Sequence, residues 1–148
     1  MPRGSLTRAS DLASLLTRLD RLQPGMKPAW GSLDAPRMVS HLCDSFRVAL
    51  GEIPSVPRHS FLARTLGKFV VVHTALPAPK GKIKTTPEML SSSPVEWERD
   101  LEALKKLAAR VASGEARAVH PAFGPLSPEE WAKLGYKHMD HHLSQFGV

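Results

Sequence analysis

Cysteine is almost absent from this sequence, with Cys43 the only one in 148 residues. A single cysteine excludes an intrachain disulfide, as is usual for proteins of reducing compartments. Long apolar runs are also missing, and none approaches the roughly 20 residues that a membrane-spanning helix needs. Residues 1–16 are basic but lack the continuous apolar stretch of a signal peptide. We therefore expect a cytoplasmic protein with no membrane partner.

Concentrated charge is missing as well, although the formal net charge is +6. A basic chain favours anionic partners, including nucleic acids. However, the lysines and arginines are scattered and no run of five like charges occurs. No helix-turn-helix, basic zipper or pattern of aromatic and basic surface residues is recognisable. We predict a solvated basic surface and no nucleic-acid partner.

Common catalytic motifs are absent from the sequence. It contains no HExxH zinc-protease motif, no GxSxG nucleophile motif and no GxxxxGK[ST] phosphate-binding loop.

What the sequence does contain is helical periodicity. Leucines recur three and four positions apart in residues 10–25, which predicts an amphipathic helix. A second helix is predicted to begin after Ser32 or Asp34, with Pro36 in its first turn, and to end at Gly51. Two further segments follow the same rules, residues 94–114 and residues 127–146.

Two segments are less regular. Residues 60–75 contain leucines at helical spacing beside a strand-like FVVVHT, and we favour a helix because no other segment offers a strand partner. Residues 75–94 are rich in proline and are predicted to form a long connecting loop, either a lid or binding loop or a disordered connector. The whole chain, residues 1–148, is thus predicted to be one all-α domain, a four-helix bundle with a long Pro-rich loop.

The C-terminal stretch EEWAKLGYKHMDHHLSQFGV contains three of the seven histidines. His138 and His142 are four positions apart, so on a helix their Cβ atoms lie about 5–6 Å apart. Both imidazoles can then reach one metal ion at about 2.0–2.1 Å. The pair continues the stripe of Trp131 and Leu134, which predicts that it faces the interior, with His141 flanking it.

A third metal ligand is predicted on the second helix. His41 lies on the predicted buried side of this helix, and helical bundles build metal sites from side chains on facing helices. Three histidines leave open positions, as a catalytic metal requires. Asp44, one turn further on, is predicted to hydrogen-bond a ligand imidazole or a metal-bound water. The alternative is that all these histidines are packing or capping groups.

Two other residues carry structural expectations. Cys43 follows His41 by two positions, which turns it to the opposite side of a helix, and we predict a buried core cysteine. His120 precedes the last helix and is predicted to make a hydrogen bond within a turn, the alternative being that it approaches the metal from a loop.

The sequence resembles the DinB/YfiT-like superfamily of metalloenzymes, and more closely an uncharacterised branch of it, a domain-of-unknown-function family. The segments that carry the resemblance are PAWGSLDAPRMVSHLCDSFRVALGE, KTTPEMLSSSPVEWERDLEALKKL and HPAFGPLSPEEWAKLGYKHMDHHLSQFGV. The resemblance implies a four-helix bundle with a divalent metal, such as zinc, nickel or iron, held by His41, His138 and His142. Superfamily members include thiol S-transferases that use low-molecular-weight thiols, and many of them pair as homodimers.

Two hypotheses follow. The first is a divalent-metal-dependent enzyme with a three-histidine site that acts on a small-molecule substrate, either as a thiol S-transferase or as a hydrolase that uses metal-bound water. The alternative is a non-enzymatic helical bundle, a binding or stress-response module with structural histidines.

Overall fold

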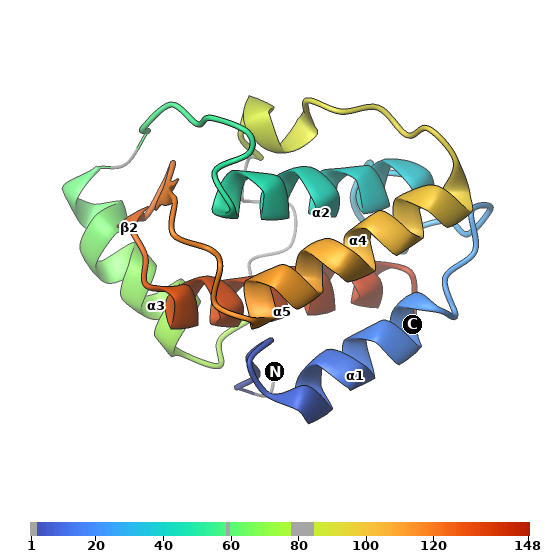
Figure 1. Ribbon diagram of the computed structural model, residues 1–148, viewed down its shortest axis with the longest axis horizontal. Coiled ribbons are helices and arrows are strands. Elements are labelled where there is room, and N and C mark those ends of the chain that lie inside the picture. The colour runs from blue at the N-terminus through green and yellow to red at the C-terminus, as the bar shows by residue number, and fades with distance from the viewer. Residues whose placement is uncertain (1–2, 59, 78–84) are drawn as a thin grey trace.

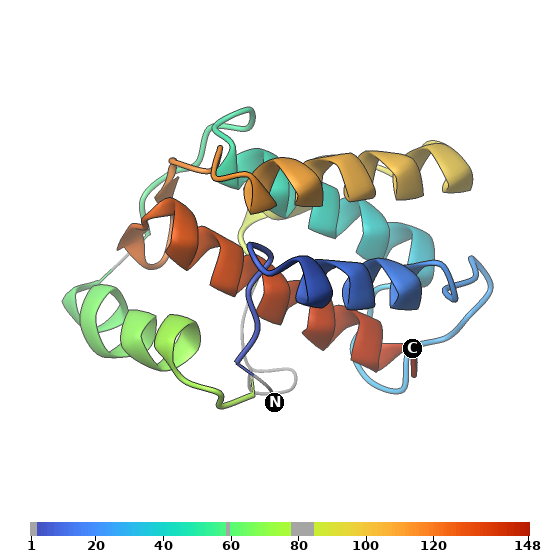
Figure 2. The same cartoon turned by 60° about the horizontal axis from the view of Figure 1, so that its bottom comes forward.

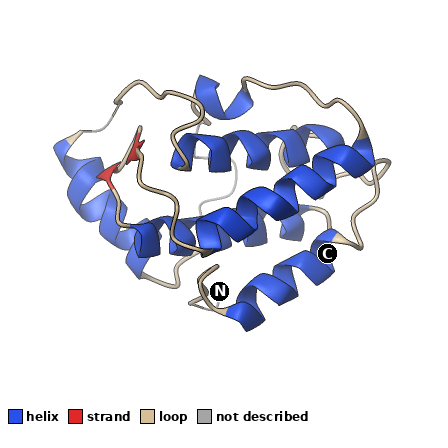
Figure 3. Ribbon diagram, in the orientation of Figure 1, coloured by secondary structure: helices blue, strands red, loops and turns tan. Residues whose placement is uncertain are grey.

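The structure, a computed structural model, describes residues 3–58, 60–77 and 85–148, and this part of the chain is mainly helical (Figures 1 and 3). The α-helices are α1 Ala9–Leu19, α2 Ala35–Ala49, α3 Lys68–His73, α4 Trp97–Ala112 and α5 Pro128–Gln145. Helix α5 contacts α1, α2 and α4, and α4 also contacts α1 and α2 (Figure 2). A mainly helical structure is thus confirmed.

The helix ends lie where the sequence predicts them. Asp34 begins α2, and its side chain accepts a hydrogen bond from the main-chain nitrogen of Arg37 at 2.8 Å. Gly51 follows this helix with a φ of 77°, a conformation that glycine adopts without strain. Ser127 and Glu130 form a capping box at the start of α5.

The predicted apolar faces meet in one core. Leu15 of α1, Met38 and Leu42 of α2 and Leu104 of α4 each have 0% exposure. Burial of a side chain of this size stabilises the fold by about 1.5–3 kcal/mol. This shared core fixes α2 against α5 and so sets the positions of the side chains that the two helices carry.

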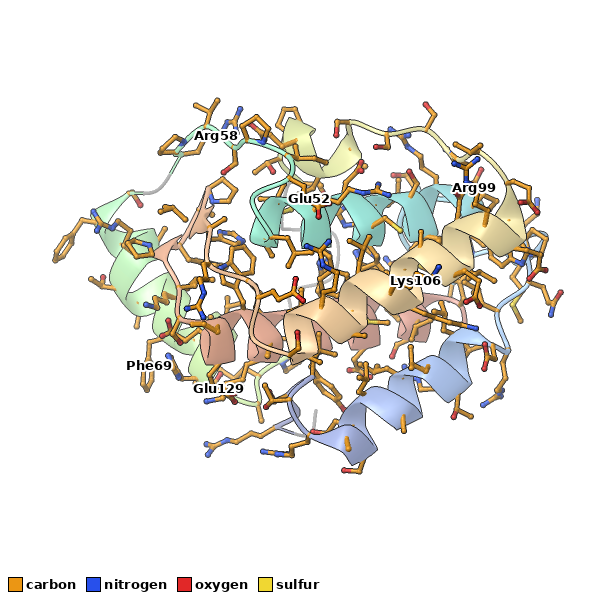
Figure 4. The ribbon with its side chains drawn as sticks, viewed as in Figure 1. Glu52, Arg58, Phe69, Arg99, Lys106 and Glu129 are labelled. Carbon is orange, nitrogen blue, oxygen red and sulfur yellow. The ribbon has the colours of Figure 1, made fainter. Side chains whose placement is uncertain are left out.

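Most of residues 60–75 is helical, from 61 to 73, which confirms the favoured prediction of a helix here. A π-helix, η1 (Ala63–Gly67), leads into α3. Together they project at one end of the molecule, where Phe61 is 84% exposed and Phe69 points outward (Figure 4). Among the described residues, no helix combines the length and apolarity that crossing a membrane would require.

The structure adds one small two-stranded sheet that an all-α prediction does not include. Strands β1 (Val119–His120) and β2 (Gly124–Pro125) pair antiparallel, with His120 opposite Gly124. Each strand has two residues, too few for the alternation of apolar and polar residues that identifies a strand. The turn between them specifies the pairing.

The connection over residues 75–94 is not wholly without secondary structure, which corrects a second prediction; its residues 78–84 lie outside the described part. A 3-10 helix, η2 (Pro87–Leu90), packs on α2 and buries Met89 to 8% exposure. Pro87 favours this turn because its ring fixes φ near the helical value. The guanidinium of Arg58 donates to the carboxylate of Glu88 in η2 at 2.8 Å, and the main-chain N–H of Arg58 donates to the carbonyl of Pro121. The proline-rich segment is thus held against the hairpin and α2.

Candidate metal centre

His41 of α2 and His138 and His142 of α5 come together where the two helices pack. Their nearest ring nitrogens all lie within 4.8 Å of one another. The Nε2 atom of His138 is 3.0 Å from Nε2 of His41 and 3.1 Å from Nε2 of His142. His41 is 2% exposed and His142 9%, whereas His138 is partly exposed to the cavity that it lines. The fold therefore assembles the three predicted histidines into one cluster.

The orientation of His41 is fixed by the proline-rich segment. Its Nδ1 lies 2.8 Å from the main-chain carbonyl oxygen of Met89 in η2. A carbonyl oxygen can only accept, so Nδ1 carries the proton and donates it. Nε2 of His41 is therefore unprotonated, and its lone pair points toward His138.

The orientation of His142 is also fixed by a hydrogen bond to its Nδ1 atom. Its Nδ1 donates to Oε1 of Gln145 at 2.7 Å, which leaves Nε2 as a lone pair. The main-chain carbonyl of Gln145 accepts from the nitrogen of Ala29 at 2.7 Å. Gly31, with a φ of 86°, lets this segment approach, because a Cβ there would lie 2.7 Å from Nε2 of Gln145. The α1–α2 connection thus holds the residue that orients His142.

The three histidines form a group that could hold a metal ion. The Nε2 atoms of His41 and His142 are both unprotonated acceptors. A proton on Nε2 of His138 can be donated to only one of these two acceptors. A cation at their centre would accept all three lone pairs. Two nitrogens bound to one ion at about 2.0–2.1 Å lie about 2.9–3.4 Å apart for octahedral or tetrahedral angles. The separations of 3.0 and 3.1 Å fall in that range, whereas the three ring nitrogens as a set lie only within 4.8 Å of one another, so binding of one ion would draw His41 and His142 closer together.

Burial keeps the imidazoles neutral. Removal from water lowers the pKa of His41, and the hydrogen bond to Met89 offsets only part of this effect. Burial lowers the pKa of His142 to about 3. The pKa of His138 falls well below its ordinary value through burial and then through its two histidine neighbours. Neutral imidazole is the form that binds metal ions.

Asp44 has a different place from the predicted one. Its fully buried carboxylate accepts from the main-chain nitrogen of Ser92 at 2.7 Å and lies 3.4 Å from the guanidinium of Arg47. It hydrogen-bonds no histidine in the described part of the chain. The group that hydrogen-bonds His41 is the Met89 carbonyl, and Asp44 acts by anchoring the segment that carries this carbonyl.

A cavity of about 390 Å³ adjoins the cluster. Its walls are mainly apolar and aromatic and include Phe46, Phe123, Trp131 and Leu134. Its volume falls within the range of small-molecule sites, about 300–1,000 Å³. Open positions on a metal held by the three histidines would face a space of this size.

Three other residues with reactive side chains, Cys43, His120 and His141, lie in or near this region. Cys43 is buried, as predicted, and burial raises the pKa of its thiol to about 12, so the thiol does not act as a nucleophile. His120 makes the predicted turn hydrogen bonds, since its Nδ1 accepts from the nitrogens of Ala122 and Phe123. His141 flanks the cluster, with its ring centroid 5.1 Å from that of His142.

Sequence reasoning did not identify Met89, Gln145 or Gly31. Gln145 lies three positions after His142 on the same helix face, and this spacing is a usable signal. Met89 contributes a main-chain oxygen, which every residue type has, so no sequence pattern could have revealed it. Gly31 matters only because of a contact between segments distant in sequence.

The fold and the cluster define a class: a mainly helical protein with three clustered histidines, two of them buried, at the wall of a mainly apolar cavity. The family described as protein of unknown function (DUF1569) matches residues 4–147, and the chain belongs to this family. No match to this chain was found among curated proteins or solved structures.

Proposed function

We propose that this protein is a divalent-metal-dependent enzyme of the DinB-like four-helix-bundle type, with His41, His138 and His142 as the ligands of zinc, nickel or iron. The observation that carries the proposal is the convergence of the three Nε2 atoms, two of them fixed as lone pairs by Met89 and Gln145. A purely structural cluster would have no need to leave one of these two acceptors without a proton, because buried polar groups are normally hydrogen-bonded.

The proposed reaction is attack by a low-molecular-weight thiol or by water on a small electrophile. A metal ion bound by three histidines keeps open positions, acts as a Lewis acid and lowers the pKa of a bound water or thiol. The resemblance to thiol S-transferases supports the thiol, and the donor set supports water equally. Cys43 is buried away from the site and does not supply the nucleophile.

In this proposal, residues around the cluster orient the metal ligands and enclose the substrate. Met89 and Gln145 hold the outer ligands at fixed angles, which raises the basicity of the metal-binding nitrogens. The aromatic walls of the cavity exclude bulk water from the reacting groups, which strengthens electrostatic interactions inside. The substrate binds in the cavity beside the partly exposed ring of His138.

The test is metal content, measured by inductively coupled plasma mass spectrometry on tag-free protein. We expect about one divalent ion per chain, as for a single closed set of ligands, and loss of this ion in His138→Ala and His142→Ala with helicity retained. His73→Ala is the matched control, because His73 lies outside the cluster and bonds Glu130 instead. Absence of metal after reconstitution with zinc, nickel and iron would overturn the proposal and favour a non-enzymatic module.

A further inference from the structure

His120 faces the same cavity from a different part of the chain. It lies at the end of β1, is 8% exposed and lines the cavity together with the three histidines. Its ring stacks on Phe123 with centroids 4.6 Å apart and packs against Trp131 at 5.2 Å. Two aromatic rings therefore pack against the His120 ring, and the hairpin turn fixes its direction through hydrogen bonds to Nδ1.

The hydrogen bonds of His120 determine its tautomer. Nδ1 accepts from the main-chain nitrogens of Ala122 and Phe123, each at 3.0 Å, so Nδ1 is unprotonated. Burial lowers the pKa of the ring to about 4, which keeps it neutral at neutral pH. The single proton is then on Nε2. Within the described residues this N–H has no hydrogen-bond partner, and it is not enclosed by protein.

A second polar group without a partner lies on the same cavity. The hydroxyl of Thr86, just before η2, is buried and has no partner among the described residues. A buried donor without an acceptor costs about 1–3 kcal/mol. A ligand that bonded Thr86 would recover this cost, and a ligand oxygen would also accept from the open Nε2–H of His120, whereas an apolar ligand would do neither.

The charge of the cavity selects against cations, and its one described lysine is already engaged by main-chain carbonyls. No carboxylate belongs to the described residues that line it, so a cationic ligand has no counter-charge. The lining cation is Lys137, and its ammonium already donates to the carbonyls of Val71 at 2.7 Å and Thr74 at 3.2 Å. The remaining walls are mainly apolar and aromatic. An uncharged ligand fits these surroundings best.

We propose that the cavity binds a compact, uncharged molecule with an apolar, aromatic body and one accepting oxygen, and that Nε2–H of His120 donates to this oxygen. If the protein is the proposed metalloenzyme, this molecule represents the class of its substrate. The inference rests on the proposed function for that point alone. Binding itself does not require the metal. His120 then orients the oxygen-bearing carbon relative to the three histidines.

The experiment uses a matched pair of probes on metal-free and zinc-loaded full-length protein. Acetophenone and ethylbenzene share a phenyl ring with a two-carbon side chain, but only acetophenone has an accepting oxygen, and benzoate adds a negative charge. Titrations are followed by NMR of ¹⁵N-labelled histidine side chains, which also reports the tautomer of each ring. We expect an Nε2–H tautomer for His120 and an affinity for acetophenone roughly two- to tenfold higher than for ethylbenzene, the range that one net hydrogen bond supplies.

His120→Phe separates the hydrogen bond from the shape of the pocket. The variant should lose the preference for acetophenone and keep the affinity for ethylbenzene. If the variant fails to fold, the wild type still decides, because acetophenone must shift the His120 Nε2 resonance and ethylbenzene must not. Equal affinities in wild type, an Nδ1–H tautomer, a preference unchanged in His120→Phe, or tighter binding of benzoate in metal-free protein would each overturn the inference. Failure to load zinc would instead count only against the metalloenzyme.

Discussion

Nδ1 of His41 donates a hydrogen bond to the main-chain carbonyl of Met89 at 2.8 Å, and this bond joins α2 to the proline-rich connection. The connection therefore orients a residue of the histidine cluster. Asp44, one turn after His41 on α2, binds the same connection through the nitrogen of Ser92. The two contacts make η2 part of the site, and they yield a prediction that separates anchoring from direct electrostatics.

Asp44→Ala should lower the free energy of unfolding by about 1–3 kcal/mol, because it leaves the Ser92 nitrogen without its buried acceptor. Metal affinity should fall as well, since the Met89 carbonyl is less firmly held. Asp44→Asn keeps an accepting oxygen, so this variant should retain most of the stability and most of the metal affinity. Urea denaturation and competition with a chelator measure the two quantities. Equal loss of metal affinity in both variants would show that the charge of Asp44 acts directly on the histidines.

Gly31→Ala should disturb the contact that orients His142. The left-handed backbone at Gly31, with φ of 86°, costs a non-glycine residue roughly 1–2 kcal/mol. The new Cβ would also meet Gln145, 2.7 Å away, and turn its amide from His142. We expect a lower melting temperature and about 10-fold weaker metal binding, the smaller end of what loss of an orienting group costs.

Gly25→Ala is the control for this substitution. Nothing lies within 4 Å of a Cβ at Gly25, and its φ is not positive. Thermal denaturation and chelator competition on the two variants should therefore differ. If both variants behave like wild type, the approach of Gly31 to Gln145 has no role in the site.

The stability of the metal-free protein should fall as pH decreases below about 6.5. His120 and His142 have pKa values lowered to about 4 and about 3 in the folded state, so the unfolded chain binds more protons in this range. Stability rises with pH wherever the unfolded state holds more protons, so acidification destabilises. His120→Gln should make the loss between pH 7 and pH 4.5 smaller by about 2 kcal/mol. Urea denaturation at the two pH values measures this, and an unchanged difference would contradict the buried, neutral state of His120.

Cys43 should resist alkylation in the folded protein. Its thiol is 3% exposed, and burial raises its pKa to about 12, so very little reactive thiolate is present at pH 8. Iodoacetamide should modify Cys43 within minutes in urea and not over hours without it, as followed by mass spectrometry. Rapid modification of native protein would place Cys43 in an accessible and activated environment, contrary to its position in the core.

Much of the helical framework was readable from the sequence. The leucine spacing of α1, the Asp34 cap of α2 and the capping box of α5 depend on residues within a few positions of one another. Local spacing also identified His138 and His142 as a pair on one face of α5. The β1–β2 hairpin and η2 were missed because two- and four-residue elements carry no periodicity.

The sequence by itself determined which residues are able to bind a metal, because side-chain chemistry and helical spacing are local properties. Only the tertiary structure decided how they are held. The Met89 carbonyl, the Gln145 amide beside Gly31, and the His120 ring at the cavity wall all depend on contacts between segments far apart in the chain. Such contacts arise from packing around the shared core, and main-chain groups take part in them regardless of residue type.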